Sequence, residues 1–106
     1  MTELVVDEVE RGQLLQLAGR LDVHAAADVR LVLADAVETG TGDLVIDLAA
    51  LEALDATGLG VLVGAHRRAD RAGRTLVLRD MTAPVRRVLS VTRLDRVLHT
   101  RTTDAA

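Results

Sequence analysis

The sequence predicts a small α/β domain with a central mixed β-sheet, helices packed on one side and the element order β-β-α-β-α-β-α-β. Three observations predict this fold class. Apolar segments typical of strands alternate with segments of helical periodicity beyond residue 22. The first two strand-like segments are separated by a short connection that contains Gly12, as in a hairpin. The chain has 106 residues, which suffices for one domain, 1–106, with its own core.

The hairpin is predicted from the first 21 residues. Segment 4–10 (LVVDEVE) alternates loosely between apolar and polar residues, which is typical of a strand, and Gly12 interrupts the alternation. Segment 14–21 (LLQLAGRL) predicts the second strand. Because the connection between them is short, we expect the two strands to pair as antiparallel neighbours.

The first predicted helix covers residues 24–38. Its apolar positions recur at helical spacing and comprise Val29, Val32, Leu33, Ala36 and Val37. Asp22 lies just before this helix and is the candidate N-cap residue. Gly40 and Gly42 are expected to end it.

The next strand and helix follow directly. Segment 43–48 (DLVIDL) predicts a buried parallel strand, and AALEAL after it reads as a connection. A second helix is expected to begin near residues 55–57 and to extend to about Ala72, where Gly73 ends it. One face of this helix carries Leu59, Leu62, Val63 and His66.

The last elements are shorter. Segment 75–80 (TLVLRD) predicts a strand, and Pro84 is suited to the first turn of a third helix that extends to about Ser90. That helix should pack Val85, Val88 and Leu89 and turn Arg86 and Arg87 to water. Segment 96–100 (RVLHT) predicts a last short strand, and residues 101–106 predict a disordered tail.

Composition excludes several function classes. The chain has no aromatic residue for base stacking, no Cys for disulfides or thiolate chemistry, and no apolar run near the roughly 20 residues of a membrane span. Its acidic N-terminus lacks the basic start of a signal peptide, so we expect a cytoplasmic protein. Residues 1–55 hold 3 Arg and 12 acidic residues (net −9), whereas residues 56–106 hold 10 Arg and 4 acidic residues (net +6). These arginines are scattered as on solvated faces, and we expect no direct contact with nucleic acid or membrane.

Three glycines, Gly58, Gly60 and Gly64, lie near the start of the second helix. Their spacing does not fit the dinucleotide fingerprint G-x-G-x-x-G, and the P-loop requires a Lys that the chain lacks. Gly60 and Gly64 are one helical turn apart, and each glycine inside a helix costs about 1 kcal/mol relative to Ala. We therefore expect this pair to allow close packing of the helix on the sheet.

An acid and a hydroxyl, Asp55 and Thr57, stand at the start of the same helix. Either side chain could cap the helix by accepting hydrogen bonds from free backbone N–H groups. A phosphoryl group on a hydroxyl here would also be stabilised by the helix N-terminus and would change the surface charge that a partner meets. The residues alone leave both interpretations open.

Two segments give the chain a resemblance to the STAS family, specifically to the stand-alone anti-sigma factor antagonists of bacteria. Segment 17–29 (LAGRLDVHAAADV) resembles the family's strand end leading into its first helix. Segment 46–69 (IDLAALEALDATGLGVLVGAHRRA) resembles its strand, loop and D-S-S/T-G-L-G helix start, and is the more specific of the two. The predicted element order also matches the family. The family usually adds a last helix, for which TRTTDAA is too short.

The resemblance implies a function in protein–protein regulation. In the family, a Ser directly after the Asp is phosphorylated by an anti-sigma factor of the ATPase-type serine kinase class, and the unphosphorylated form binds that kinase and frees a sigma factor. The Ser corresponds to Ala56, which has no hydroxyl, and Thr57 matches the second hydroxyl position. The implied partner-binding residues are Asp22, Asp55, Ala56, Thr57, Gly58 and Leu59.

Two consequences of Ala56 are possible within this resemblance. Thr57 takes over as phosphoacceptor, or the chain binds its partner constitutively. Adjacent helical residues are separated by a rotation of about 100°, so a kinase aimed at position 56 need not reach Thr57. This geometry favours constitutive binding.

Enzymatic functions have little support in the sequence. Ser90 lies outside any nucleophile elbow. His24 with Asp28, and His66 with Asp70, have an i,i+4 spacing that could serve a metal but favours local helix pairs. We therefore expect no catalytic residue, no metal and no cofactor. The alternative function is a non-enzymatic STAS scaffold or a module that binds a small ligand, such as a nucleotide or a lipid.

Overall fold

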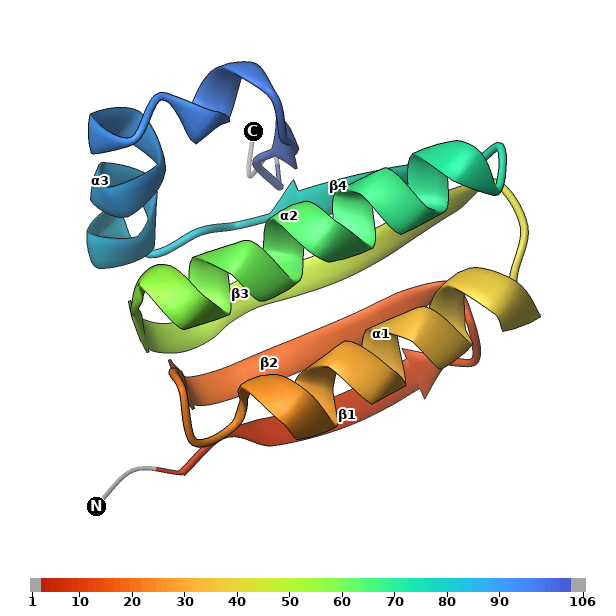
Figure 1. Cartoon of the computed structure of the whole chain (residues 1–106), viewed down its shortest axis with the longest axis horizontal. Helices are drawn as coiled ribbons and strands as arrows, with labels where there is room; N and C mark the ends of the chain where they lie inside the picture. The colour runs from red at the N-terminus through yellow and green to blue at the C-terminus, as the bar shows by residue number, and fades with distance from the viewer. Residues whose placement is uncertain (1–2, 104–106) are drawn as a thin grey trace.

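A computed structural model describes residues 3–103 of the chain. Its five strands form one mixed sheet in the order β1-β2-β3-β4-β5, in which β1 (Val5–Glu10) is antiparallel to β2 (Leu14–Leu21). Strand β3 (Asp43–Leu54), β4 (Thr75–Arg79) and β5 (His99–Arg101) continue the sheet in parallel. Figure 1 shows α1 (Ala26–Thr39) and α2 (Ala56–Arg71) side by side, and α3 (Ala83–Val91) beyond the end of β4. The predicted fold class and element order are confirmed.

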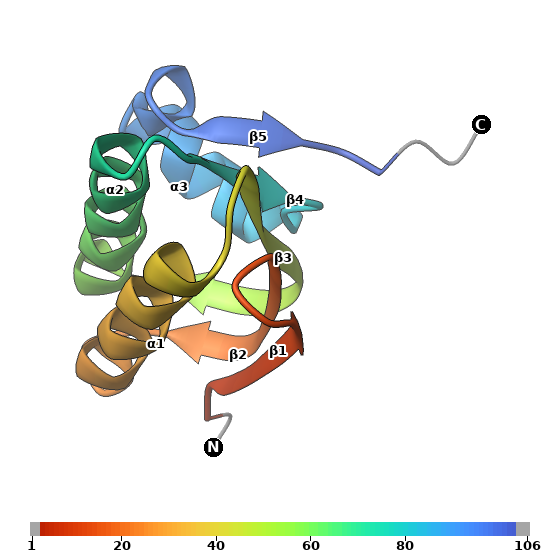
Figure 2. The ribbon, with the colours of Figure 1, turned by 90° about the vertical axis from the view of Figure 1, so that its right-hand side faces the viewer.

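The helices and the sheet enclose one core on one side of the sheet. Figure 2 shows α1 and α2 on the same side of the strands, and Val85 and Leu89 of α3 belong to the same buried cluster. The cluster is built from aliphatic side chains alone, with fully buried members that include Leu15, Leu17, Ile46, Leu62 and Leu78. Within residues 3–103, no helix is both long and apolar enough to cross a bilayer.

The hairpin has the predicted strand pairing. Strand β2 has the predicted bounds, and its alternation places Leu15, Leu17 and Leu21 in the core with no exposed surface. Gly12 has a φ of +69°, a left-handed conformation that favours glycine at the turn. The turn therefore holds the antiparallel pairing that the sequence predicted.

The start of α1 differs from the prediction. The helix begins at Ala26, its N-cap residue is Ala25, and no side chain caps it. Asp22 instead accepts a hydrogen bond from the backbone N–H of His24 at 3.0 Å. An additional turn, in which the N–H of Ala25 donates to the carbonyl of Asp22 at 3.1 Å, separates the carboxylate from the helix. The assignment of Asp22 as N-cap was therefore wrong.

Strand β3 is six residues longer than predicted. Segment AALEAL continues the strand to Leu54 instead of leaving the sheet. Its pairing with β2 shifts register twice, between Gln16 and Ala18 and between Gly19 and Arg20. Such bulges interrupt the alternation of apolar residues, and alanine has a weak preference for strands, so the extension leaves little trace in the sequence pattern.

The C-terminal part follows the prediction up to α3 and then departs from it. Helix α2 and strand β4 lie where expected, and α3 carries Pro84 in its first turn. Arg96 belongs to a short 3₁₀ helix (Leu94–Arg96), and β5 begins only at His99. The expected disordered tail from residue 101 is also corrected, since Arg101 is part of β5 and Thr103 is hydrogen-bonded to Asp80. Residues 104–106 lie outside the described range.

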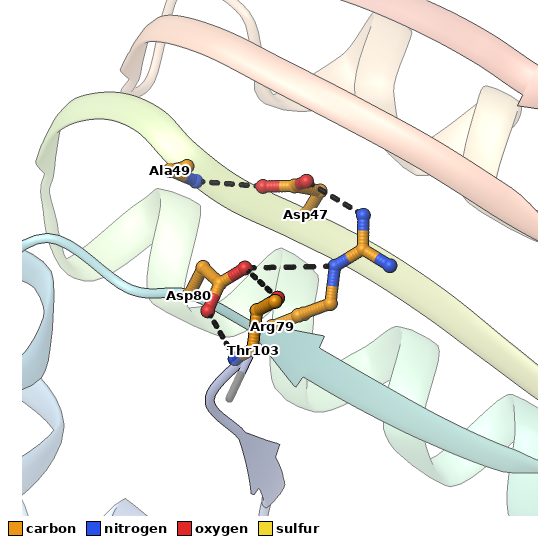
Figure 3. A network of polar contacts seen from close by, with 5 residues as sticks. All are labelled: Asp47, Ala49, Arg79, Asp80 and Thr103. Carbon is orange, nitrogen blue, oxygen red and sulfur yellow. Dashed lines mark hydrogen bonds and ion pairs between the residues drawn. The ribbon is translucent and has the colours of Figure 1, made fainter. Parts of the chain in front are cut away.

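Asp80 fastens the segment after β5 to the end of β4 (Figure 3). Its backbone N–H donates to the carbonyl of Arg101 at 2.9 Å, and its carboxylate accepts from the Thr103 N–H at 2.6 Å and from the Thr103 hydroxyl. Arg79 lies beside it, with its Nε 3.7 Å from Asp80 and its Nη2 2.8 Å from Asp47. The Thr103 hydroxyl is the main cause that lowers the pKa of Asp80 below its ordinary value, followed by the Thr103 amide and Arg79.

We expect Asp80 to titrate below the ordinary aspartate pKa of about 3.9 and Thr103→Ala to move its pKa upward. Because folding lowers this pKa, the stabilisation is present above the unfolded-state value and is lost as the pH falls through the folded-state value. Carbon-13 NMR of the Asp80 carboxyl group during an acid titration measures both variants. If Thr103→Ala left the titration midpoint of Asp80 unchanged, that would contradict the role of the Thr103 hydroxyl in lowering this pKa.

At the opposite end of the strands, Arg74 joins the β1–β2 turn, the end of α1 and the loop before β3. It is 5% exposed and is the single buried charged residue between residues 3 and 103. Its guanidinium donates to the carbonyls of Ala36 (2.8 Å), Val37 (3.0 Å), Gly12 (2.6 Å) and Gly42 (2.9 Å). Burial lowers the pKa of Arg74, and the carboxylate of Asp43 opposes this effect. The expectation that the arginines lie on solvated faces was therefore wrong for this residue.

Candidate functional site

The end of β2 and the start of α2 meet at one edge of the sheet. Because β2 and β3 are parallel neighbours, the loops that follow them leave at the same edge. Asp55 joins the two loops. One of its carboxylate oxygens accepts from the Gly58 N–H at 2.8 Å, and the other accepts from the Val23 N–H at 3.0 Å. The backbone N–H of Asp55 also donates to the carbonyl of Leu21 at 3.2 Å.

Asp55 is therefore the N-cap residue of α2, and of the two predicted cap candidates, Asp55 and Thr57, it is Asp55 that caps the helix. Thr57 is the second residue of the helix and is exposed, and its hydroxyl forms no hydrogen bond with any part of the chain that the structure describes. The Thr57 hydroxyl thus has no capping role. The Val23 amide is a partner of Asp55 that sequence reasoning missed, because a backbone N–H leaves no signature in the sequence.

The six predicted partner-binding residues divide into two groups. Asp55, Ala56 and Thr57 are exposed and Asp22 is partly exposed, so all four contribute to one surface. Gly58 and Leu59 are buried and lie beneath it. The buried pair therefore positions the surface, and the four exposed residues are the ones that a partner can contact. We call these four residues, Asp22, Asp55, Ala56 and Thr57, the α2-start surface.

Gly58 is the glycine that permits the close approach of α2 to β2. A Cβ atom at this position would lie 2.2 Å from the Leu21 carbonyl oxygen, well inside van der Waals contact. Gly60 and Gly64 are different, because a Cβ at either position would have no neighbour within 4 Å, and both residues are exposed. The prediction that Gly60 and Gly64 pack against the sheet was wrong.

The hollow beside the α2-start surface has an acidic lining. It is open, has a volume of about 490 Å³ and is lined by Glu3, Leu4, Arg20, Asp22, His24, Ala25 and Asp28. Three carboxylates and one guanidinium line it, so the local charge opposes a phosphate-bearing ligand. This lining disfavours the alternative of nucleotide binding at this edge.

The histidines and aspartates that are four residues apart do not form ion pairs. Neither His24–Asp28 nor His66–Asp70 is among the ion pairs found within residues 3–103, which corrects the expectation of local helix pairs. His66 instead lies near His99, with ring centroids 5.5 Å apart. In the same part of the chain, no three His, Cys, Asp or Glu side chains are grouped as a metal site requires.

The family model for the STAS domain matches residues 3–106. The chain is 30% identical over 93 residues to an anti-sigma F factor antagonist of Paenibacillus polymyxa, which covers 86% of this chain and 80% of that protein. It is 27% identical over 85 residues to an anti-sigma-B factor antagonist of Staphylococcus epidermidis, and this match covers 80% of this chain and 79% of that protein.

Solved structures show the same fold. An anti-sigma factor antagonist from Mycobacterium paratuberculosis superposes with a TM-score of 0.74 at 23% identity, over 99% of this chain and 88% of that one. The unphosphorylated form of the anti-sigma factor antagonist SpoIIAA gives a TM-score of 0.71 at 22% identity, over 95% of this chain and 90% of that one.

Proposed function

The chain belongs to the STAS domain family, and we propose that it acts as an anti-sigma factor antagonist. In this proposal the α2-start surface binds an anti-sigma factor and so frees a sigma factor to activate transcription. The observation that carries the proposal is the exposed surface formed by Asp55, Ala56 and Thr57 beside the Asp22 loop, on a chain that resembles named antagonists over most of its length. The matched family consists of non-enzymatic regulators, so the chain is a regulator and not an enzyme.

The partner is, in our proposal, an anti-sigma factor of the ATPase-type serine kinase class. Ala56 occupies the position of the phosphoacceptor Ser in the antagonists that the chain resembles, and its exposed methyl group cannot accept phosphate. Thr57 is exposed as well, but it lies about 100° further round the helix. A kinase that binds this surface with its active site over position 56 therefore leaves Thr57 unmodified, and binding is constitutive.

We expect no phosphate on Thr57 after incubation of the chain with its anti-sigma factor and ATP. Ala56→Ser should gain phosphoserine under the same conditions, because it returns a hydroxyl to an exposed position in the first turn of α2. Peptide mass spectrometry measures both. Phosphothreonine at position 57 of the unaltered chain would contradict constitutive binding, and an unmodified Ala56→Ser would contradict the kinase class of the partner.

A pull-down from the source cell tests the antagonist function itself. The unaltered chain should recover an anti-sigma factor, and Ala56→Asp and Thr57→Asp should recover less of it because each adds a negative charge to the surface. Ala83→Asp is the matched control, since Ala83 is the exposed first residue of α3 just as Ala56 is the exposed first residue of α2. Equal recovery by all four proteins would argue against the α2-start surface as the binding site.

A further inference from the structure

A shallow groove follows the seam between α1 and α2 on the outer side of the helices. It has a volume of about 210 Å³ and is lined by Arg30, Leu33, Ala34, Val61, Gly64, Ala65, Arg68 and Arg71. We call this set of residues the α1–α2 groove. Its floor is made of apolar and small residues, and its charged residues are all arginines. The groove is therefore an apolar channel with a basic rim.

The rim arginines carry positive charge that the protein itself barely neutralises. Among the described residues, the one carboxylate within ion-pair distance of the rim is Glu38, whose oxygen lies 4.0 Å from Arg68. Both side chains of this pair are well exposed, at 47% and 73%, and such surface pairs contribute little. Arg30 and Arg71 form no ion pair within residues 3–103. The charge of the groove thus complements an acidic partner segment.

The groove is continuous with the α2-start surface. At about 100° per residue, Thr57, Gly64, Arg68 and Arg71 fall on one side of α2, and all four are exposed. A rise of about 1.5 Å per residue places Arg68 about 17 Å along the helix from Thr57. Between them no side chain stands above the helix at Gly60 and Gly64, where a Cβ would meet nothing within 4 Å. A partner seated on Thr57 can therefore lie along α2 as far as the arginines.

We infer that the α1–α2 groove is a second contact surface for the anti-sigma factor, which fills it with an acidic segment. This inference rests on the proposed function. The charge of the groove determines the chemistry of this segment, because the groove presents guanidinium groups about 17 Å along α2 from Thr57. The partner segment that complements this rim therefore carries carboxylates.

The test measures the affinity of the purified chain for the anti-sigma factor that the pull-down identifies, at low and at physiological salt. Gly64→Leu places a larger side chain in the groove, where a Cβ at position 64 meets nothing within 4 Å, and Arg71→Glu reverses one rim charge. We expect each variant to bind at least about tenfold more weakly, and the effect of Arg71→Glu to shrink as salt rises. Arg87→Glu, which reverses the charge of an exposed residue on α3, is the matched control. Its affinity should stay within about twofold of that of the unaltered chain.

The outcomes separate the groove from the proposed function. If Gly64→Leu and Arg71→Glu bound with normal affinity while Ala56→Asp bound weakly, the α1–α2 groove would not be a contact surface. The proposed antagonist function would remain intact. Failure of the unaltered chain to bind any anti-sigma factor would overturn both. Circular dichroism checks that Gly64→Leu is folded, which we expect because leucine is a stronger helix former than glycine.

Discussion

Arg74→Ala should lower the free energy of unfolding by about 3–4 kcal/mol, which is a large loss for a domain of this size. The guanidinium donates to carbonyls from the β1–β2 turn, the end of α1 and the loop before β3, and so joins three parts of the chain. Removal of the side chain leaves several buried acceptors without donors, at about 1–3 kcal/mol for each that water does not reach. Chemical denaturation monitored by circular dichroism measures the loss.

Two further variants separate hydrogen bonding from packing at this position. Arg74→Met fills similar volume without donors and should destabilise nearly as much as Arg74→Ala. Arg74→Lys keeps the charge but lacks the planar fork that reaches carbonyls on both sides, so it should recover only part of the loss. Arg67→Ala on the exposed face of α2 should change stability by no more than about 0.5 kcal/mol. An Arg74→Ala protein as stable as Arg67→Ala would contradict the role of Arg74.

Gly58→Ala should destabilise the fold by about 2–3 kcal/mol, although alanine normally stabilises helices. The added Cβ would lie 2.2 Å from the Leu21 carbonyl oxygen and 2.8 Å from the Leu21 Cγ, so the start of α2 must move away from β2. That movement would also stretch the hydrogen bonds by which Asp55 joins Gly58 to Val23. Thermal and chemical denaturation measure the effect.

Gly60→Ala is the matched control for Gly58→Ala, two residues further along the same helix. Its Cβ meets nothing within 4 Å, so the substitution should stabilise the protein by about 0.5–1 kcal/mol through helix propensity alone. The two glycine substitutions therefore have opposite expected signs. If Gly58→Ala stabilised the protein as Gly60→Ala does, the close approach of α2 to β2 would be contradicted.

Most of the fold could be predicted from local patterns. The alternation of apolar residues predicted both end residues of β2 correctly, and helical periodicity together with Gly73 predicted the position of α2. The second half of β3 could not be predicted, because its strand character comes from pairing with β2 across two bulges. Asp22 looked like a helix cap because only the folded chain contains the extra turn that separates it from α1.

The candidate site was predicted unevenly. Asp55 was identified as a possible cap because an acid directly before a helical pattern is a local signal. The roles of the glycines depend on which side of α2 faces β2, and one-turn spacing alone does not determine that side. Arg74 carried no signal at all, because every basic residue of the chain is an arginine and its partners are backbone carbonyls far away in sequence.

The most direct test of the proposed function is the Kd of the purified chain and its anti-sigma factor, measured with ATP present throughout. We predict that the unaltered chain binds equally well before and after prolonged incubation with ATP, because Ala56 cannot accept phosphate. Ala56→Asp should bind at least about tenfold more weakly, a loss of about 1.4 kcal/mol. Equal affinity of Ala56→Asp and the unaltered chain, or loss of binding by the unaltered chain during incubation, would contradict constitutive binding through the start of α2.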